Sequence, residues 1–277
     1  MVKVFDAHCH FGKFGIVRMK GNDIELFRNR ELATPEDMER YMKKNNIIKV
    51  VAVPHYTPTP EKPFKEFNPA ILDALDKVNG FYGGLWVNPA MPDFTKEVLK
   101  LFNHPKLVAL KISPANWTKD ITIDPKTWPA KFKESMESVI EFAKQEKIVL
   151  HAHTGHGASS IYAYEKFIEQ YGNDLKIQLL HMGSSCSGHA AFVPRFIKLI
   201  EKGYDVYTDI SSSKGMGLPF LLQELMDKCE EGIERIFFAT DEPWGVFGAQ
   251  FALVNSMDIS GRIKSKILFD NANRLYG

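Results

Sequence analysis

Short, nearly continuous apolar runs alternate along the chain with longer segments in which apolar residues recur every three or four positions. Apolar runs without polar alternation are typical of parallel strands buried on both faces, and the longer segments have the period of amphipathic helices. We expect strands at residues 2–10, 47–53, 81–87, 107–112, 148–153, 177–181, 204–209 and 235–241. We expect helices at residues 37–45, 70–78, 94–102, 130–145, 161–171, 192–201 and 219–229, with a helical tail over 247–257 and 262–268.

Eight strand–helix units in one chain predict a closed (β/α)₈ TIM barrel, formed as a single domain over residues 1–277. The competing architecture is an open, doubly wound sheet, which usually carries a glycine-rich nucleotide loop after its first strand. Here the first strand ends in His8-Cys9-His10, and the sequence holds no G-x-G-x-x-G or Walker-type pattern. The barrel is therefore favoured.

Composition limits the classes of partner. The 277 residues carry a net charge of +1, so no basic field is available to hold nucleic acid. No apolar run approaches the roughly 20 residues of a membrane span, and the early charges of Lys3 and Asp6 argue against a signal peptide. The three cysteines share no C-x-x-C spacing, which fits a reducing setting. We expect a cytoplasmic protein with a small-molecule substrate, no nucleic-acid or membrane partner, and leave a homodimer open.

Polar side chains gather at the carboxyl ends of the predicted strands. His8 and His10 share one face of the first strand, because successive side chains of a strand alternate. The carboxyl ends of barrel strands converge on one mouth, and an unpaired buried polar group is costly, so these residues indicate a built site. The other residues at strand ends are Lys111, His151, His153, His181 and Asp241. Since the eighth strand closes against the first, Asp241 should lie beside the two leading histidines.

Five motifs carry a resemblance to a known family. They are Asp6-Ala7-His8-Cys9-His10-Phe11-Gly12, His153-Thr154-Gly155, Leu180-His181-Met182-Gly183, Ala239-Thr240-Asp241-Glu242-Pro243-Trp244 and the closing Asn271-Ala272-Asn273-Arg274-Leu275-Tyr276-Gly277. In this order, along the whole chain, they resemble the amidohydrolase superfamily, specifically the amidohydrolase-2 branch of metal-dependent TIM-barrel enzymes. That branch contains the relatives of aminocarboxymuconate-semialdehyde decarboxylase.

The resemblance implies a metal centre and a catalytic pair. His8, His10, His153 and Asp241 would be the ligands of one divalent ion, Zn²⁺ by expectation, with Mn²⁺ or Fe²⁺ as alternatives. His181 would be the neighbouring acid or base, with Asp241 able to combine ligation with proton transfer. The physical logic agrees, since a divalent ion lowers the pKa of its water toward about 7 and an imidazole can carry the released proton.

Lys111 and Trp244 are the expected substrate-binding residues. A lysine inside the barrel needs an anionic partner, and we favour substrate near a single metal over a carboxylated lysine that bridges two metals. Trp244 and Trp117 could stack on a flat substrate or pack beneath loops. Residues 13–32 are expected to form an active-site loop. Residues 211–217 form either an anion-binding or a solvated loop.

The leading hypothesis for function is a metal-dependent hydrolase that attacks an amide, ester or lactone carbonyl with metal-activated water. The alternative is a non-oxidative decarboxylase of a small carboxylic acid on the same mononuclear site. A non-enzymatic binding protein is disfavoured because every position needed for the chemistry is filled. A TatD-like nuclease is disfavoured by the near-neutral charge and by Lys111, since those enzymes place a carboxylate on the fourth strand.

Overall fold

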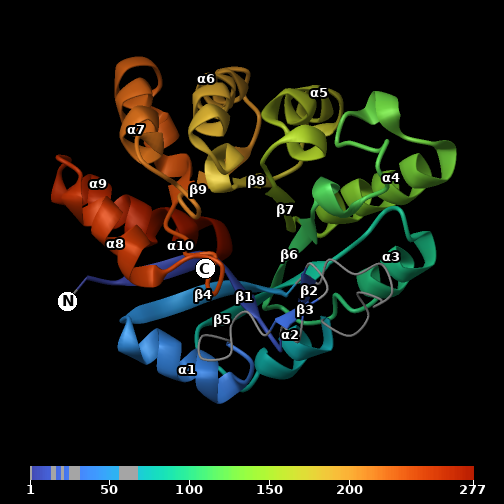
Figure 1. The fold of residues 1–277 in the computed structure, drawn as a ribbon, viewed down its shortest axis with the longest axis horizontal. Helices are drawn as coiled ribbons and strands as arrows, with labels where there is room; N and C mark the ends of the chain where they lie inside the picture. The colour runs from blue at the N-terminus through green and yellow to red at the C-terminus, as the bar shows by residue number, and fades with distance from the viewer. Residues whose placement is uncertain (1, 14–16, 20–21, 25–31, 56–67) are drawn as a thin grey trace.

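The computed structural model describes residues 2–13, 17–19, 22–24, 32–55 and 68–277 (Figure 1). Eight parallel strands form one sheet in the order β1-β4-β5-β6-β7-β8-β9-β10, and helices surround it. The strands are β1 (Val4–Phe11), β4 (Ile47–Pro54), β5 (Phe81–Trp86), β6 (Leu107–Ile112), β7 (Val149–His153), β8 (Ile177–Leu180), β9 (Val206–Asp209) and β10 (Ile236–Phe237). The (β/α)₈ prediction is confirmed.

The helices follow the strands along the chain. They are α1 (Pro35–Lys44), α2 (Asn68–Ala74), α3 (Pro92–Leu99), α4 (Ala130–Gln145), α5 (Ile161–Tyr171), α6 (Cys186–Glu201), α7 (Gly217–Lys228), α8 (Phe247–Ser256), α9 (Gly261–Ser265) and α10 (Asn271–Tyr276). Within the described parts of the chain, no helix has the length and hydropathy needed to cross a membrane.

Backbone hydrogen bonds between the last and first strands nearly close the barrel. The amide of Ala7 donates to the carbonyl of Phe238 at 2.9 Å, and the amide of His10 donates to that of Glu242 at 2.8 Å. The amide of Asp241 donates in return to the carbonyl of His8 at 2.8 Å. The chain therefore follows β1 beyond the assigned end of β10, and Asp241 lies beside the two leading histidines as expected.

Two layers of apolar side chains hold the barrel. The larger lies between the strands and the outer helices. The smaller fills the barrel interior and includes Phe5 and Ala7 of β1 together with Ala272 and Tyr276 of α10. The closing helix therefore supplies side chains to the inner core, which brings the Tyr276 hydroxyl close to polar groups of the strands.

Several predicted boundaries differ from the structure. Helix α6 begins at Cys186 and not at residue 192, because Ser185 caps it by accepting from the amide of Gly188. Its first turns carry small residues without an apolar period, so the pattern did not mark them. Within the predicted loop at 13–32, β2 (Val17–Met19) and β3 (Asn22–Ile24) pair antiparallel, and much of the rest lies outside the described residues.

Candidate functional site

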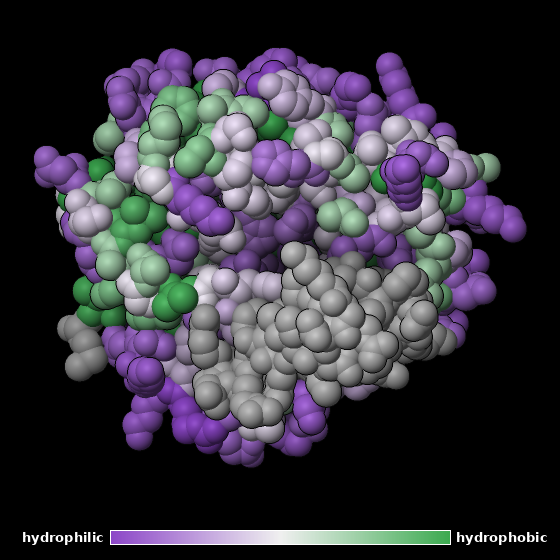
Figure 2. Space-filling view, in the orientation of Figure 1, coloured by the Kyte–Doolittle hydropathy of each residue, from purple (hydrophilic) through white to green (hydrophobic). Residues whose placement is uncertain are grey.

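The mouth of the barrel holds a cavity of about 460 Å³. Its lining includes four predicted site residues with imidazole or carboxylate groups, His10, His153, His181 and Asp241. Figure 2 shows a hydrophilic hollow on the face viewed in Figure 1. The expectation that polar residues at the carboxyl ends of the strands meet at one mouth (the strand-end rule) therefore agrees with the structure for these side chains.

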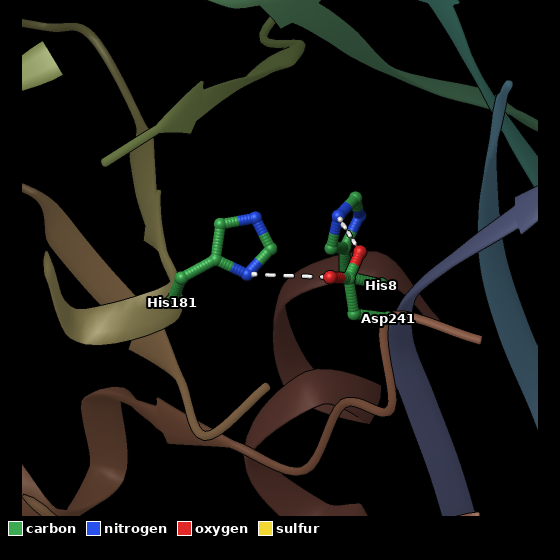
Figure 3. A group of neighbouring side chains, drawn as sticks. All are labelled: His8, His181 and Asp241. Carbon is green, nitrogen blue, oxygen red and sulfur yellow. Dashed lines mark ion pairs between the residues drawn. The ribbon is translucent and has the colours of Figure 1, made fainter. Parts of the chain in front are cut away.

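Asp241 lies at the centre of a histidine cluster. Its Oδ1 is 3.3 Å from Nε2 of His8 and 3.1 Å from Nε2 of His10. Its Oδ2 is 3.9 Å from Nδ1 of His181 (Figure 3). Donor atoms of His8, His181 and Asp241 all lie within 4.8 Å of one another, which is a spacing that a single metal ion can span.

The hydrogen bonds of the two β1 histidines test whether this cluster fits a cation. Nδ1 of His10 lies 2.9 Å from the carbonyl oxygen of Pro54, which can only accept, so this nitrogen carries the proton. In the neutral ring, Nε2 of His10 then points a lone pair at a carboxylate oxygen. Among the described residues, neither ring nitrogen of the fully buried His8 has a hydrogen-bond partner. The lone pair of His10 beside the Asp241 carboxylate, and a buried His8 without a hydrogen bond to a described residue, fit a bound divalent ion.

The protonation states of the cluster also fit a bound divalent ion. Burial lowers the pKa of His8 and of His153 well below the ordinary value, so both imidazoles are neutral at pH 7. Burial alone would raise the pKa of Asp241, but His181, His10 and His8 hold it well below its usual range. A divalent ion requires neutral imidazoles and an ionised carboxylate, and these residues present both.

His153 lies at the end of β7 next to His181, with ring centroids 4.8 Å apart. Tyr164 donates to the carbonyl of His153 at 2.9 Å and so fixes the strand end. The hydroxyl of Thr154 donates to the carbonyl of Leu180, which joins this end to that of β8. His153 is not one of the donor group His8, His181 and Asp241, so its ligation stays a prediction.

The backbone is strained where two of these side chains leave it. His181 has a φ of 68° and Asp241 a φ of 57°, both in the left-handed region that non-glycine residues rarely adopt. Such conformations persist where the surrounding structure enforces them, and they cluster at functional sites. Here they turn both side chains from the strand ends into the mouth.

Lys111 is buried in the same cavity, and its Nζ has no hydrogen-bond partner among the described residues. The ammonium lies 5.8 Å from the ring centroid of Trp86, and burial lowers its pKa to about 8. Trp244 lines the cavity and is 46% exposed. Trp117 instead packs on Phe132 with ring centroids 4.9 Å apart, so its packing alternative holds.

The sequence analysis missed two aromatic neighbours of the expected metal ligand His10. Trp86 ends β5 and donates from Nε1 to the carbonyl of Pro54 at 2.9 Å. His55, which follows β4, is buried and stacks on His10 with ring centroids 5.4 Å apart. The strand-end rule that found Lys111 would also have found Trp86.

Asp6 supports the end of β1 through hydrogen bonds to α1 and to the residue before Asp241. It accepts from the hydroxyl of Tyr41 at 2.8 Å and from the amide and hydroxyl of Thr240 at 3.0 and 2.6 Å. Burial raises the pKa of Asp6 to about 7, against the lowering effect of these donors. The network ties β1 to α1 and to the residue before Asp241, and so fixes the geometry of the cluster.

Comparisons with known proteins give a family match and a shared fold. A family model described as Amidohydrolase (Amidohydro_2) matches residues 5–277. A search of curated proteins by sequence finds no match. The solved structures that resemble the chain are distant in sequence but similar over their whole length.

Three of these structures illustrate the likeness. A 2,6-dihydroxybenzoate decarboxylase from Rhizobium is 13% identical, with a TM-score of 0.70 and coverage of 99% of this chain and 98% of that one. A 5-carboxyvanillate decarboxylase from Novosphingobium aromaticivorans, complexed with manganese and 4-hydroxy-3-methoxy-5-nitrobenzoic acid, is 14% identical, with a TM-score of 0.69 and coverage of 100% and 96%. A probable 2-pyrone-4,6-dicarboxylic acid hydrolase from Acinetobacter baumannii is 13% identical, with a TM-score of 0.67 and coverage of 99% and 98%.

Proposed function

The chain belongs to the Amidohydro_2 family of the amidohydrolase superfamily, and from this premise we propose that it is a metal-dependent decarboxylase of a small, flat carboxylic acid. The sequence analysis placed hydrolysis first and decarboxylation second. We reverse that order because of one residue in the cavity and because decarboxylases are prominent among the similar structures.

Lys111 is the observation that carries the proposal. A buried ammonium without a hydrogen-bond acceptor is costly, and a substrate carboxylate would remove that cost. With a pKa of about 8, the side chain is mostly charged at pH 7. Trp86 and Trp244 line the same cavity and offer faces for a flat ring. The substrate of a decarboxylase always carries a carboxylate, whereas an amide, ester or lactone substrate of a hydrolase need not carry one.

The cluster would supply the remaining chemistry. A divalent ion held by His8, His10, His153 and Asp241 would act as a Lewis acid toward an anionic substrate oxygen. Nδ1 of His181 lies 2.8 Å from Oγ of Ser211, and the side chain lines the cavity. Burial lowers the pKa of His181 to about 3, so its ring is neutral at pH 7, and it would relay a proton from solvent to the substrate. Loss of CO₂ breaks one carbon–carbon bond, and the carbon takes up that one proton.

The identity of the metal is part of the proposal. Imidazole and carboxylate donors suit both Zn²⁺, the ion expected from the sequence, and Mn²⁺. Manganese is bound in similar structures of two decarboxylases, 5-carboxyvanillate decarboxylase and a dihydroxybenzoic acid decarboxylase. We therefore propose Mn²⁺ and Zn²⁺ as the ions to test first.

Hydrolysis remains the second candidate, and one comparison favours it. The probable hydrolase from Acinetobacter baumannii takes its name from a dicarboxylic acid, and its structure has citric acid bound. A lactone that carries a carboxylate would satisfy Lys111 equally well, with His181 acting as base toward water. The two reactions differ in their products, which makes them separable by experiment.

The deciding experiment uses three acids in parallel. Protein loaded with Mn²⁺ or Zn²⁺ is incubated with 2,6-dihydroxybenzoate, 5-carboxyvanillate and 2-pyrone-4,6-dicarboxylate, and both CO₂ release and opening of the pyrone ring are followed. We expect CO₂ from a benzoate, lost in the His181→Asn variant with its metal content intact. Ring opening without CO₂ from any acid would overturn the proposal in favour of the hydrolase.

Other expectations stay proposals. The small-molecule substrate is implied by the cavity, and a homodimer is left open. Cys9, Cys186 and Cys229 are all free thiols, which accords with a cytoplasmic setting.

A further inference from the structure

Beneath the metal-facing cluster, a string of buried side chains crosses the inside of the barrel. Its carboxylate, Asp209, ends β9 and is fully buried. It receives hydrogen bonds from two directions, one from the side of His181 and one from the side of the closing helix α10. The members of the string are His181, Ser211, Asp209, Gln178, Tyr276 and His151.

The first arm runs from Asp209 to His181. Oδ1 of Asp209 accepts from the amides of Ser211 and His181 at 3.0 and 3.2 Å, and also from the hydroxyl of Ser211. Because the serine proton is used there, the Ser211 oxygen can only accept from Nδ1 of His181, 2.8 Å away. His181 is therefore the Nδ1–H tautomer, and its Nε2 is unprotonated in the neutral ring.

The second arm runs from Asp209 to His151. Nε2 of Gln178 donates to Oδ2 of Asp209 at 2.8 Å, which fixes the orientation of the amide. Oε1 of Gln178 then accepts from the hydroxyl of Tyr276 at 2.5 Å. The Tyr276 oxygen, having used its proton, accepts from Nε2 of His151 at 2.7 Å. His151 is therefore the Nε2–H tautomer, which agrees with its buried Nδ1 having no hydrogen-bond partner among the described residues.

We propose that Asp209 is a positioning residue whose negative charge sets the tautomers of both histidines. A carboxylate accepts at both oxygens, so every proton along the two arms points toward it. Burial raises the pKa of Asp209 to about 6, and the donors around it oppose that effect, so the group is ionised at pH 8. The consequence for turnover rests on the proposed function, since His181 lines the cavity and the Nδ1–H tautomer leaves Nε2 as its nitrogen without a proton.

Exchange of Asp209 for asparagine gives a sharp expectation. The asparagine oxygen can keep the place of Oδ1 and its three donors, so His181 should retain the Nδ1–H form. The asparagine NH₂ then replaces Oδ2 and must donate to Gln178, whose amide turns over. Tyr276 would next accept from Gln178 and donate to His151, which shifts toward the Nδ1–H tautomer. The Ser211→Ala variant should do the opposite, releasing His181 while leaving His151 unchanged.

The test is a two-bond ¹H–¹⁵N correlation spectrum of metal-free protein at pH 8 with labelled histidines, in which protonated and unprotonated ring nitrogens are distinct. The signals are assigned by their loss in His181→Asn and His151→Asn variants. Asp205→Asn, just before the same strand, alters a pair with Arg235 and should change neither histidine. The proposal for Asp209 is overturned if wild-type His181 carries its proton on Nε2, or if Asp209→Asn leaves the tautomer of His151 unchanged.

Turnover separates this inference from the proposed function. On the benzoate that releases CO₂, Ser211→Ala should lower kcat by about 10- to 100-fold, the usual loss for a supporting partner, with KM and metal content retained. Rescue by Ser211→Thr, which restores the hydroxyl, would exclude a packing effect. If Ser211→Ala changes the tautomer of His181 but not kcat, the inference about tautomers holds and the catalytic role proposed for His181 is wrong.

Discussion

Replacement of Lys111 by methionine should stabilise the folded protein while it removes activity. Burial lowers the pKa of this ammonium from 10.5 to about 8. At about 1.4 kcal/mol per pKa unit, the charged form costs the folded state about 3 kcal/mol at pH 7. The contact with the Trp86 ring, at 5.8 Å, returns about 1 kcal/mol that methionine loses. The expected net gain is about 2 kcal/mol in the free energy of unfolding.

The pH dependence of stability tests independently whether the charge of Lys111 destabilises the folded protein. Between pH 8 and 10.5 the unfolded chain holds the Lys111 proton and the folded protein has released it, so this residue makes wild-type stability rise with pH across that window. The Lys111→Met variant lacks this contribution. Its advantage over the wild type should be full at pH 7 and should shrink through the window until it is gone above pH 10.5.

The assay is urea unfolding of both metal-free proteins at several pH values, followed by far-UV circular dichroism. Lys228→Met, an exposed lysine paired with Glu224, serves as control and should change stability little at any pH. Alongside the gain in stability, kcat/KM on the benzoate substrate should fall by about 100-fold, since a buried charged hydrogen bond is lost. A variant less stable than wild type at pH 7, or one whose advantage does not depend on pH, would refute the reasoning.

Three further substitutions test the cluster and its supports. We expect elemental analysis to find one divalent ion per wild-type chain and none in the His8→Ala/His10→Ala double variant, whose Tm added Mn²⁺ should no longer raise. Tyr41→Phe removes a donor to the buried β1 carboxylate and should lower the free energy of unfolding by about 1–2 kcal/mol in urea. Gly183→Ala should lose more than about 1 kcal/mol, because φ is +84° and a Cβ would come 2.7 Å from a carbonyl, whereas Gly261→Ala meets no atom and should be neutral or stabilising.

The barrel and much of its mouth could be predicted because one rule links sequence to position. Parallel strands buried on both faces read as apolar runs, and a polar residue that ends such a run must lie at the mouth. His10, Lys111 and Asp241 follow from that rule alone, and the structure brings all three to one cavity. The partner of the first strand was also predictable, because closure of a barrel leaves no other neighbour for the eighth.

The hydrogen-bond network around Asp209 was not predictable, because no such rule links its members in the sequence. Gln178 and Tyr276 are separated by 98 positions, and nothing in their local patterns links them. Asp209 ends a strand, so the rule could have placed it at the mouth, but its role depends on which donors pack around it. The predicted start of α6 was wrong because Ser185 caps the helix at a position where the sequence shows no apolar period. The left-handed backbone at His181 is likewise enforced by tertiary contacts.

The costly features of this molecule lie together at the mouth and have opposite electrostatic needs. Among the residues that the structure describes, His8 has no hydrogen-bond partner beside the ionised Asp241, which calls for a cation, and Lys111 has no acceptor in the same cavity, which calls for an anion. Asp241 and Lys111 carry opposite single charges, so a bound divalent ion leaves the cavity with an excess of positive charge. That excess favours an anionic substrate, and binding linkage requires that the substrate strengthen metal binding by the same factor. A substrate with a carboxylate at one end and a second anionic oxygen at the other would satisfy both needs at once.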